Sequence, residues 1–334
     1  MIIKQLWQHL SNRRKKQGCL LVILMTLASL MEVVSIGAVV PFLAALTSPE
    51  KIYNYEVIQP LINILGITNS SQLVLPFTAF FIIATISAAL VRLLLLYVST
   101  RFSYAVGADL SISIYRRTLY QDYTVHTSRN SSEIINSIIT KTNTVIGGIL
   151  APTVTFMSSI FLMSGIVTVV FVINAEIAMF SFSAFASFYV LVAFYTRKSL
   201  RKNSDLIAEK STQMIKSLQE GLGGIRDVLI DGSQEFYCKL YQSADLPLRR
   251  ATGHNIFIAG SPRYLMEAVG MVLIASLAYV LTLQQNGLVS AIPVLGALAV
   301  GAQKLLPALQ QAYGSYSAIK GSKTSFDDVL DLLN

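Results

Sequence analysis

Apolar residues occur along the chain in long blocks separated by polar stretches, instead of alternating with polar residues at the period of a soluble helix or strand. A helix that crosses a lipid bilayer needs about 20 mostly apolar residues. Six blocks meet this length, and we expect each to form a membrane-spanning helix. Their approximate bounds are 18–46, 73–100, 145–173, 177–196, 264–283 and 288–306. The pattern therefore predicts an all-α, polytopic membrane protein.

The composition agrees with lipid as the surrounding solvent. Of the 334 residues, 53% are hydrophobic and 13% are charged, whereas soluble domains carry about 25% charged residues. So little charge cannot cover a water-facing surface. The basic segment 1–17 precedes an apolar block that is too long for a signal-peptide core and has no small-residue cleavage site, so we expect it to remain as an uncleaved first span.

The distribution of positive charge predicts the orientation, because lysine and arginine concentrate in the cytoplasmic loops of membrane proteins. Here 23 of the 26 lie in segments 1–17, 101–144, 197–263 and 307–334, and Lys51 alone lies in a connection on the opposite side. We therefore expect a multi-pass protein of the plasma (inner) membrane with both termini in the cytoplasm. The net charge of +8 does not indicate a nucleic-acid partner, since the cations flank apolar blocks without RNP-like or zinc-finger spacing.

The cysteines and histidines show no metal-binding pattern. Cys19 and Cys238 are far apart and form no CxxC spacing. His9, His126 and His254 are isolated from one another and from any HExxH arrangement. We predict neither a disulfide nor a metal site.

The two long connections on the cytoplasmic side, of about 44 and 67 residues, are predicted to be largely helical. Segments 103–120 and 198–222 contain no proline and place apolar residues three and four apart. The sequence NSSE at 130–133 is typical of a helix start, and a glycine-rich stretch at 221–224 precedes a short segment at 225–237. Two short elements are thus expected far from the membrane, at the ends of helical arms. The alternative is a small cytoplasmic cap with no partner.

One connection on the other side, 47–72, is long enough to form structure. Its apolar and aromatic residues predict a short interfacial helix over 52–65 that contacts lipid. A plug that only covers the end of the bundle is the alternative.

Six spans with two long inner connections resemble the transmembrane half of ATP-binding-cassette (ABC) exporters. The sequence YTVHTSRNSSEII from Tyr123 resembles the first coupling helix of that family, and EGLGGIRDVLI from Glu220, continued to Phe236, resembles the second. The resemblance implies that both helices contact a nucleotide-binding domain. The residues it assigns to this contact are Tyr123, Val125, His126, Thr127, Arg226, Asp227, Val228 and Leu229.

The same resemblance implies a domain organisation and partners. Residues 1–17 form a basic cytoplasmic segment, 18–320 form the six-helix transmembrane domain, and 321–334 begin a linker to a nucleotide-binding domain. No GxxxxGK[ST] motif occurs, and the sequence GSKT at 321–324 lacks the GK pair. We therefore expect no catalytic residue in this chain, ATP and Mg²⁺ on a nucleotide-binding domain of the same or another polypeptide, and a homodimeric, ATP-hydrolysing translocase as the complete transporter.

Within this family the sequence resembles PglK-type flippases of lipid-linked oligosaccharides. The stretches that carry the likeness are VPF at 40–42, SPRYLMEAVG at 261–270 and QKLLP at 303–307. The resemblance implies a membrane lipid or lipid-linked glycan as substrate, with a phosphate or pyrophosphate group, moved between the two leaflets.

Two cations, Arg92 and Lys304, lie inside predicted spans, where a charge costs about 2.5–3.5 kcal/mol and calls for a function. The resemblance assigns them, with Arg263, to a central cavity that attracts the substrate phosphate, a group to which guanidinium binds well. The structural alternative pairs Arg92 with Glu32 on the first span and Arg263 with Glu267 one turn along its own helix.

Other functions stay open at this point. An exporter of another lipid, a polysaccharide or a peptide differs only in its cargo. A six-helix channel or ion-coupled carrier without an ATPase is expected to show inverted repeats or paired interrupted spans, and the sequence shows neither. A membrane scaffold whose inner loops recruit a partner is the third possibility.

Overall fold

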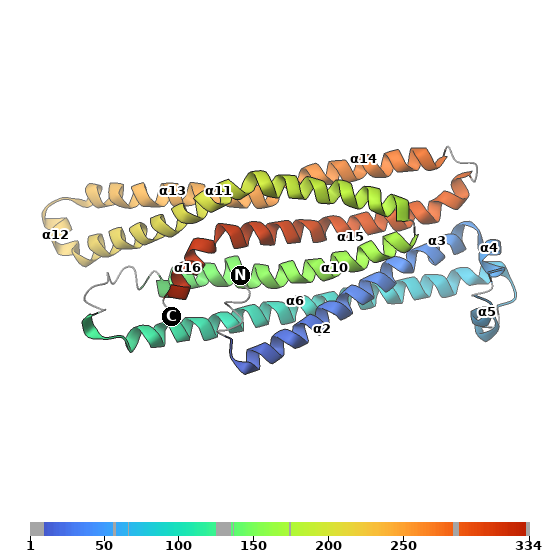
Figure 1. Ribbon diagram of the computed structural model, residues 1–334, viewed down its shortest axis with the longest axis horizontal. Coiled ribbons are helices and arrows are strands. Elements are labelled where there is room, and N and C mark those ends of the chain that lie inside the picture. The colour runs from blue at the N-terminus through green and yellow to red at the C-terminus, as the bar shows by residue number, and fades with distance from the viewer. Residues whose placement is uncertain are drawn as a thin grey trace.

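The molecule is an elongated bundle of helices, and the described part of the chain contains no strand (Figure 1). The computed structural model describes residues 10–55, 58–65, 67–124, 135, 137–173, 175–282 and 287–331. The α-helices are α2 Asn12–Gly37, α3 Val39–Thr47, α4 Pro49–Tyr53, α5 Gln59–Leu65, α6 Val74–Leu119, α9 Thr142–Val145, α10 Ala151–Ile173, α11 Ala175–Gly223, α12 Ile225–Ile230, α13 Gln234–Gly260, α14 Pro262–Thr282, α15 Gly287–Gly321 and α16 Lys323–Asp331. The 3-10 turn η2 (Ser70–Leu73) precedes α6, and the π-helical segments η3 (Ser137–Lys141) and η4 (Ile146–Leu150) flank α9.

Large apolar side chains cover the outside of the bundle. Three helical stretches of the described chain are long and apolar enough to cross a membrane: Asn12–Thr47, Ser70–Leu119 and Ile138–Val172. In the most apolar window of the second, only 17% is buried, so its leucine and isoleucine side chains require an apolar solvent. These stretches contain the first two predicted spans and all but the last residue of the third. The other three predicted spans lie in α11, α14 and α15, where many side chains are outside the described residues, and their crossing of the membrane stays a prediction.

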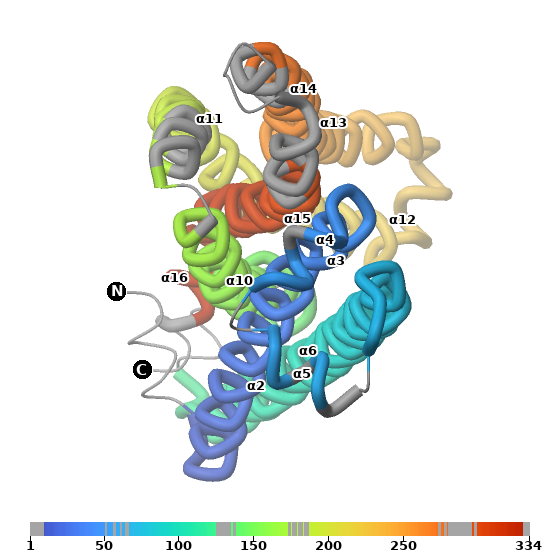
Figure 2. Tube along the Cα trace, turned by 90° about the vertical axis from the view of Figure 1, so that its right-hand side faces the viewer, coloured from blue at the N-terminus to red at the C-terminus, as the bar shows by residue number. Residues whose placement is uncertain are grey.

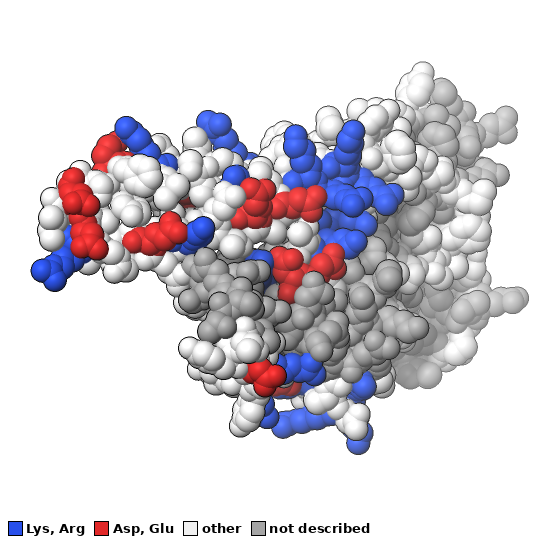
Figure 3. All heavy atoms as spheres, turned by 60° about the vertical axis from the view of Figure 1, so that its left-hand side comes forward, with Lys and Arg blue, Asp and Glu red and all other residues white. Residues whose placement is uncertain are grey.

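Two helices extend far beyond their apolar blocks, as the sequence predicts. α6 continues to Leu119 and α11 to Gly223 without interruption. α11 and α13 pack side by side up to the end of the molecule that carries α12 (Figure 1). We call residues 197–260 the arm. Figure 3 shows charged side chains over the arm and none among the described residues on the right-hand side of the view.

Two details of the opposite end differ from the sequence prediction. The first span is interrupted between α2 and α3, because Pro41 has no N–H to donate to the carbonyl of Gly37. The helix expected over 52–65 is wrong as a single element, since α4 ends before Asn54 and α5 starts at Gln59 with Pro60 in its first turn. Asn54 lies in a turn and Tyr55 lies outside any helix, so a continuous helix through this segment is excluded. The predicted helix start at 130–133 lies outside the described residues.

The helices form three layers when viewed along the bundle (Figure 2). α10 and α15 lie in the middle, α2 and α6 on one side, and α11 and α14 on the other. The largest buried cluster joins these layers through Ile36 of α2, Ile166 of α10, Leu200 of α11, Met266 of α14 and Leu305 of α15. The middle helices therefore hold the two outer layers together.

α16 packs against the bundle at the base of the arm. Phe326 and Val329 are fully buried. Lys141 forms an ion pair with Asp328, at 2.6 Å between Nζ and Oδ2, and the Ser204 hydroxyl of α11 donates to Thr324 Oγ1 at 3.1 Å. Residues 323–331 are therefore an ordered part of the bundle.

Small residues let α2 and α10 approach closely, as is common between membrane helices. A Cβ atom placed on Gly165 of α10 would overlap the hydroxyl of Ser29 and lie 3.1 Å from Val33 Cγ2. That hydroxyl donates to the carbonyl of Phe161 at 2.6 Å, so it cannot move without breaking a hydrogen bond. A Cβ atom placed on Gly253 of the arm would instead have, within the described chain, no contact closer than 4 Å beyond its own helix backbone.

The exchange Gly165→Ala is expected to lower the stability of the folded protein by about 1–3 kcal/mol through overpacking. The matched change Gly253→Ala removes an equally helical glycine without a clash and should leave stability unchanged or raise it by up to about 1 kcal/mol. Thermal unfolding of both variants in the same detergent measures the difference. A midpoint for Gly165→Ala at or above that of Gly253→Ala would contradict the close approach of α2 and α10.

Candidate functional site

Lys304 lies between helices in an ion pair. Its Nζ atom is 2.8 Å from Oε1 of Glu32 on α2, although no aligned hydrogen bond from a described residue reaches that oxygen. The same ammonium donates to the hydroxyl of Ser35 at 3.3 Å. The Glu32 side chain is 4% exposed and the Lys304 side chain 24%. The carboxylate is thus the buried partner, and the ammonium remains partly accessible.

This pair is part of a polar chain that crosses three helices. The hydroxyls of Ser35 on α2 and Thr85 on α6 are 3.4 Å apart, so the chain runs from α15 through α2 to α6. Sequence reasoning missed Ser35 and Thr85. The spacing of Glu32 and Ser35, three residues apart on one helix face, is the signal that could have identified the first of them.

Arg92 is half-buried on α6. The interpretation that pairs it with Glu32 is wrong, because Glu32 contacts Lys304. Among the described residues, Arg92 forms neither a hydrogen bond nor an ion pair. It follows Thr85 by seven residues, which places both on the same face of α6 at a separation of about 10 Å along the axis. Arg92 therefore lies on the helix face that also meets the polar chain from Lys304.

Arg263 is the second residue of α14 and is exposed. Glu267 is exposed as well, and no ion pair between the two occurs in the described chain. α14 and α15 pack against each other as an antiparallel pair (Figure 1), which puts Arg263 at a depth similar to that of Lys304. Within the described chain, Arg263, Arg92 and Lys304 share no carboxylate or hydroxyl partner.

The far end of the arm presents apolar side chains to solvent. α12 starts after Gly224 and ends before the turn at Gly232, whose φ of +64° favours glycine. Val228 is 5% exposed and fixes α12 to the arm, whereas Leu229 is 60% and Ile230 71% exposed. Arg226 and Asp227 are exposed too. Exposed apolar residues of this kind at one end of a molecule are typical of a contact surface.

The other predicted contact segment is described only at its start. Tyr123 is exposed, shortly after the end of α6. Val125, His126 and Thr127 lie outside the described residues, so the first predicted coupling helix stays a prediction.

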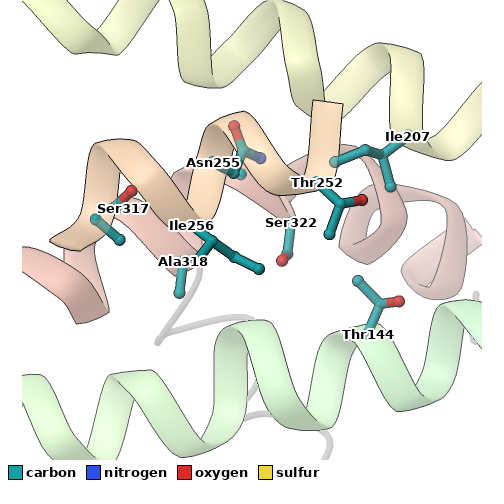
Figure 4. Close-up of a pocket in the computed structure, with 10 residues that line it drawn as sticks. Thr144, Ile207, Thr252, Asn255, Ile256, Ser317, Ala318 and Ser322 are labelled. Atoms are coloured by element: carbon teal, nitrogen blue, oxygen red, sulfur yellow. The ribbon is translucent and has the colours of Figure 1, made fainter. Parts of the chain in front are cut away.

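A cavity of about 280 Å³ lies near the base of the arm (Figure 4). Ile207 and Ile256 line it together with small, hydroxyl-bearing and amide side chains, among them Thr144, Thr252, Asn255, Ser317 and Ser322. None of the described residues that line this cavity is charged, and Arg92, Lys304 and Arg263 are not among them. An anionic group requires cations that this lining does not offer, so the cavity is not the predicted substrate site.

Comparison with known families identifies the chain. The family model of the ABC transporter transmembrane region matches residues 18–295, which include most of the first apolar helical stretch, all of the other two, the arm with α12, and α14. The match covers well over half of the sequence. The chain therefore belongs to the family of ABC transporter transmembrane regions.

Proposed function

We propose that this chain is the transmembrane domain of an ATP-driven exporter that moves an anionic lipid-linked glycan or glycolipid from one leaflet to the other. Membership of the ABC transporter family supports the ATP-driven part, since such transmembrane regions work with nucleotide-binding domains. The resemblance to PglK-type flippases, the Lys304 ammonium between helices and the half-buried Arg92 support the class of cargo. We further propose a homodimer in the inner membrane, with both termini and the arm in the cytoplasm.

The observation that carries the cargo proposal is the environment of Arg92. A guanidinium in an apolar helix is costly without an anion, and Arg92 has no carboxylate partner among the described residues. A phosphate or diphosphate would provide paired acceptors for its donor fork. The lipid tail of such a substrate can stay in contact with the bilayer while its head passes between the helices.

Lys304 would take part by exchanging partners. In this structure its charge is balanced by Glu32, so an arriving phosphate competes with a carboxylate that is already in place. The ammonium is the more exposed member of the pair, which makes it the accessible one. Before the substrate arrives, Glu32 would thus neutralise the charge of Lys304, so that the pair itself carries no net charge.

The arm is the proposed connection to the ATPase. Its tip carries the exposed side chains of Arg226, Asp227 and Leu229, and Val228 holds α12 in position beneath them. A nucleotide-binding domain that binds this tip can move α11 and α13 together, because the two helices pack along their length.

Replacing Arg92 with alanine should reduce lipid-stimulated ATPase activity and transport at least about tenfold, a loss of about 1.4 kcal/mol of substrate interaction. Arg92→Lys should retain part of the activity, because it keeps the charge but not the paired donors. The assay uses the transporter assembled with its nucleotide-binding domains in liposomes. Arg101→Ala is the control on the same helix, since Arg101 is exposed and bonded to Tyr97. Full transport by Arg92→Ala would exclude the role of Arg92.

A second set of variants separates a structural from a substrate role for Lys304. Lys304→Met alone should destabilise the protein by about 3–5 kcal/mol, because Glu32 stays buried without a cation. The double change Glu32→Gln with Lys304→Met removes both charges and should recover most of the thermal stability but not substrate-stimulated ATPase activity. If the double variant recovers both, Lys304 serves only the ion pair.

At the tip, Leu229→Asp should abolish the stimulation of ATPase activity by substrate, because it puts a charge into the proposed apolar contact. Leu246→Asp changes another exposed apolar residue, on the side of the arm, and should leave stimulation intact. Equal behaviour of the two variants would remove the argument for the tip as the contact surface.

A further inference from the structure

Four cations from three helices gather where the arm joins the bundle. Arg197 and Arg201 lie on α11, Lys320 lies near the end of α15, and Lys323 is the first residue of α16. We call these four residues the basic cluster. α11 and α15–α16 are tied together on both sides of it. Figure 3 shows lysine and arginine side chains gathered between the arm and the uncharged part of the same face.

Hydrogen bonds fix the helices that carry the basic cluster. On the side of the predicted span, the hydroxyls of Thr196 and Tyr313 are 3.0 Å apart. On the side of the arm, the Thr324 hydroxyl donates to Asp205 Oδ1 at 2.7 Å and accepts from the hydroxyl of Ser204 at 3.1 Å. These contacts between the helices therefore hold the cations close together against their mutual repulsion.

The positive charges act on each other. Burial lowers the pKa of Lys320, and the positive charges of Arg197, Lys323 and Arg201 lower it further. The ammonium of Lys320 lies 6.0 Å from the centre of the Tyr316 ring, a contact that compensates only in part. The folded protein thus brings these cations together at a cost in free energy.

No carboxylate balances the basic cluster in the described chain. None of its four members takes part in an ion pair there. The nearby Asp205 carboxylate instead accepts a hydrogen bond from the hydroxyl of Thr324. Four other cations of the arm each pair with a carboxylate: Lys210, Lys216, Lys239 and Arg249. Within the described chain, Lys198, Lys202, Arg226 and Arg250 share with the basic cluster the lack of an ion pair. Because α11, α15 and α16 bring its four unpaired charges together, the basic cluster offers several cationic partners at once to an anion that is not part of this chain.

The position of the basic cluster selects the kind of anion. The predicted span 177–196 is about 30 Å long at 1.5 Å per residue, which matches the hydrocarbon core of a bilayer. Arg197 and Arg201 then lie within about 8 Å of its end, in the layer of lipid headgroups. Phe194 and Tyr195, which shortly precede Arg197 on α11, are exposed. Aromatic residues are common at the edge of a membrane.

We propose that the basic cluster binds the phosphate of an anionic phospholipid in the leaflet next to the arm. The two guanidinium groups, held one turn apart on α11, grip the phosphate oxygens in pairs, and Lys320 and Lys323 add charge from the neighbouring helices. Basic pockets between membrane helices are known to hold anionic headgroups in this way. A lipid bound here braces α11 against α15 and α16, at the base of the arm. This site is separate from the proposed substrate path at Arg92 and Lys304.

The test compares lipid selectivity in nanodiscs that contain the complete transporter in phosphatidylcholine with a trace of spin-labelled lipid. Electron paramagnetic resonance measures the fraction of label immobilised by the protein. Wild type should prefer labelled phosphatidylglycerol over labelled phosphatidylcholine about fivefold or more. The variant Arg197→Gln, Arg201→Gln, Lys320→Gln, Lys323→Gln should lose this preference.

A matched control removes the same number of positive charges from the arm: Lys210→Gln, Lys216→Gln, Lys239→Gln, Arg249→Gln. It should keep the preference, and an equal loss in both variants would overturn the proposal in favour of an unspecific charge effect. Should the fourfold variant fail to fold, Arg197→Gln with Arg201→Gln, both exposed, gives the same comparison. Millimolar inorganic phosphate should not reduce the preference, and a loss on its addition would identify a soluble phosphate as the ligand instead.

Discussion

The structure depends on lipid as the solvent for its outer surface. α6 exposes most of its apolar side chains, and α2 and α10 are of the same type. In lipid such surfaces cost nothing, but each backbone polar group has to be paired within its own segment, so helices are the form that these stretches take. Helix association then rests on close packing and on polar contacts between helices. The approach of Gly165 to Ser29 and the chain from Lys304 through Glu32 and Ser35 are contacts of these two kinds.

The long helices and their ends could be predicted from the sequence because they depend on local signals. The apolar blocks and the absence of proline predicted the long extensions of α6 and α11, and the glycines at 221–224 predicted the break before α12. Pro41 and Pro60 also carry local signals, which account for the break after Gly37 and for two short helices instead of one over 52–65. The hydrophobic pattern alone does not show the effect of these two prolines.

The partners of charged residues could not be predicted in the same way. The sequence offered Arg92 as a partner of Glu32, and only the packing of α2 against both α6 and α15 shows that Lys304 is its partner. Likewise, Val228 belongs to the predicted contact segment by sequence, yet its side chain turns into the arm while Leu229 faces outward. Such choices depend on contacts between residues far apart in the chain, which a hydrophobic pattern does not encode.

The proposed mechanism requires that the arm and α4–α5 lie on opposite sides of one membrane. Labelling of one cysteine in the arm and one near α4 tests this directly in intact cells. Both are studied in a protein that carries Cys19→Ser, which removes the other exposed cysteine. Cys238 is a native, exposed thiol on α13 near the tip of the arm, and Asn54→Cys adds one in the turn after α4. A membrane-impermeant maleimide should label position 54 in intact cells and Cys238 only after the membrane is permeabilised. Labelling of Cys238 in intact cells, with position 54 protected, would contradict the orientation and the ATP-driven mechanism built on it.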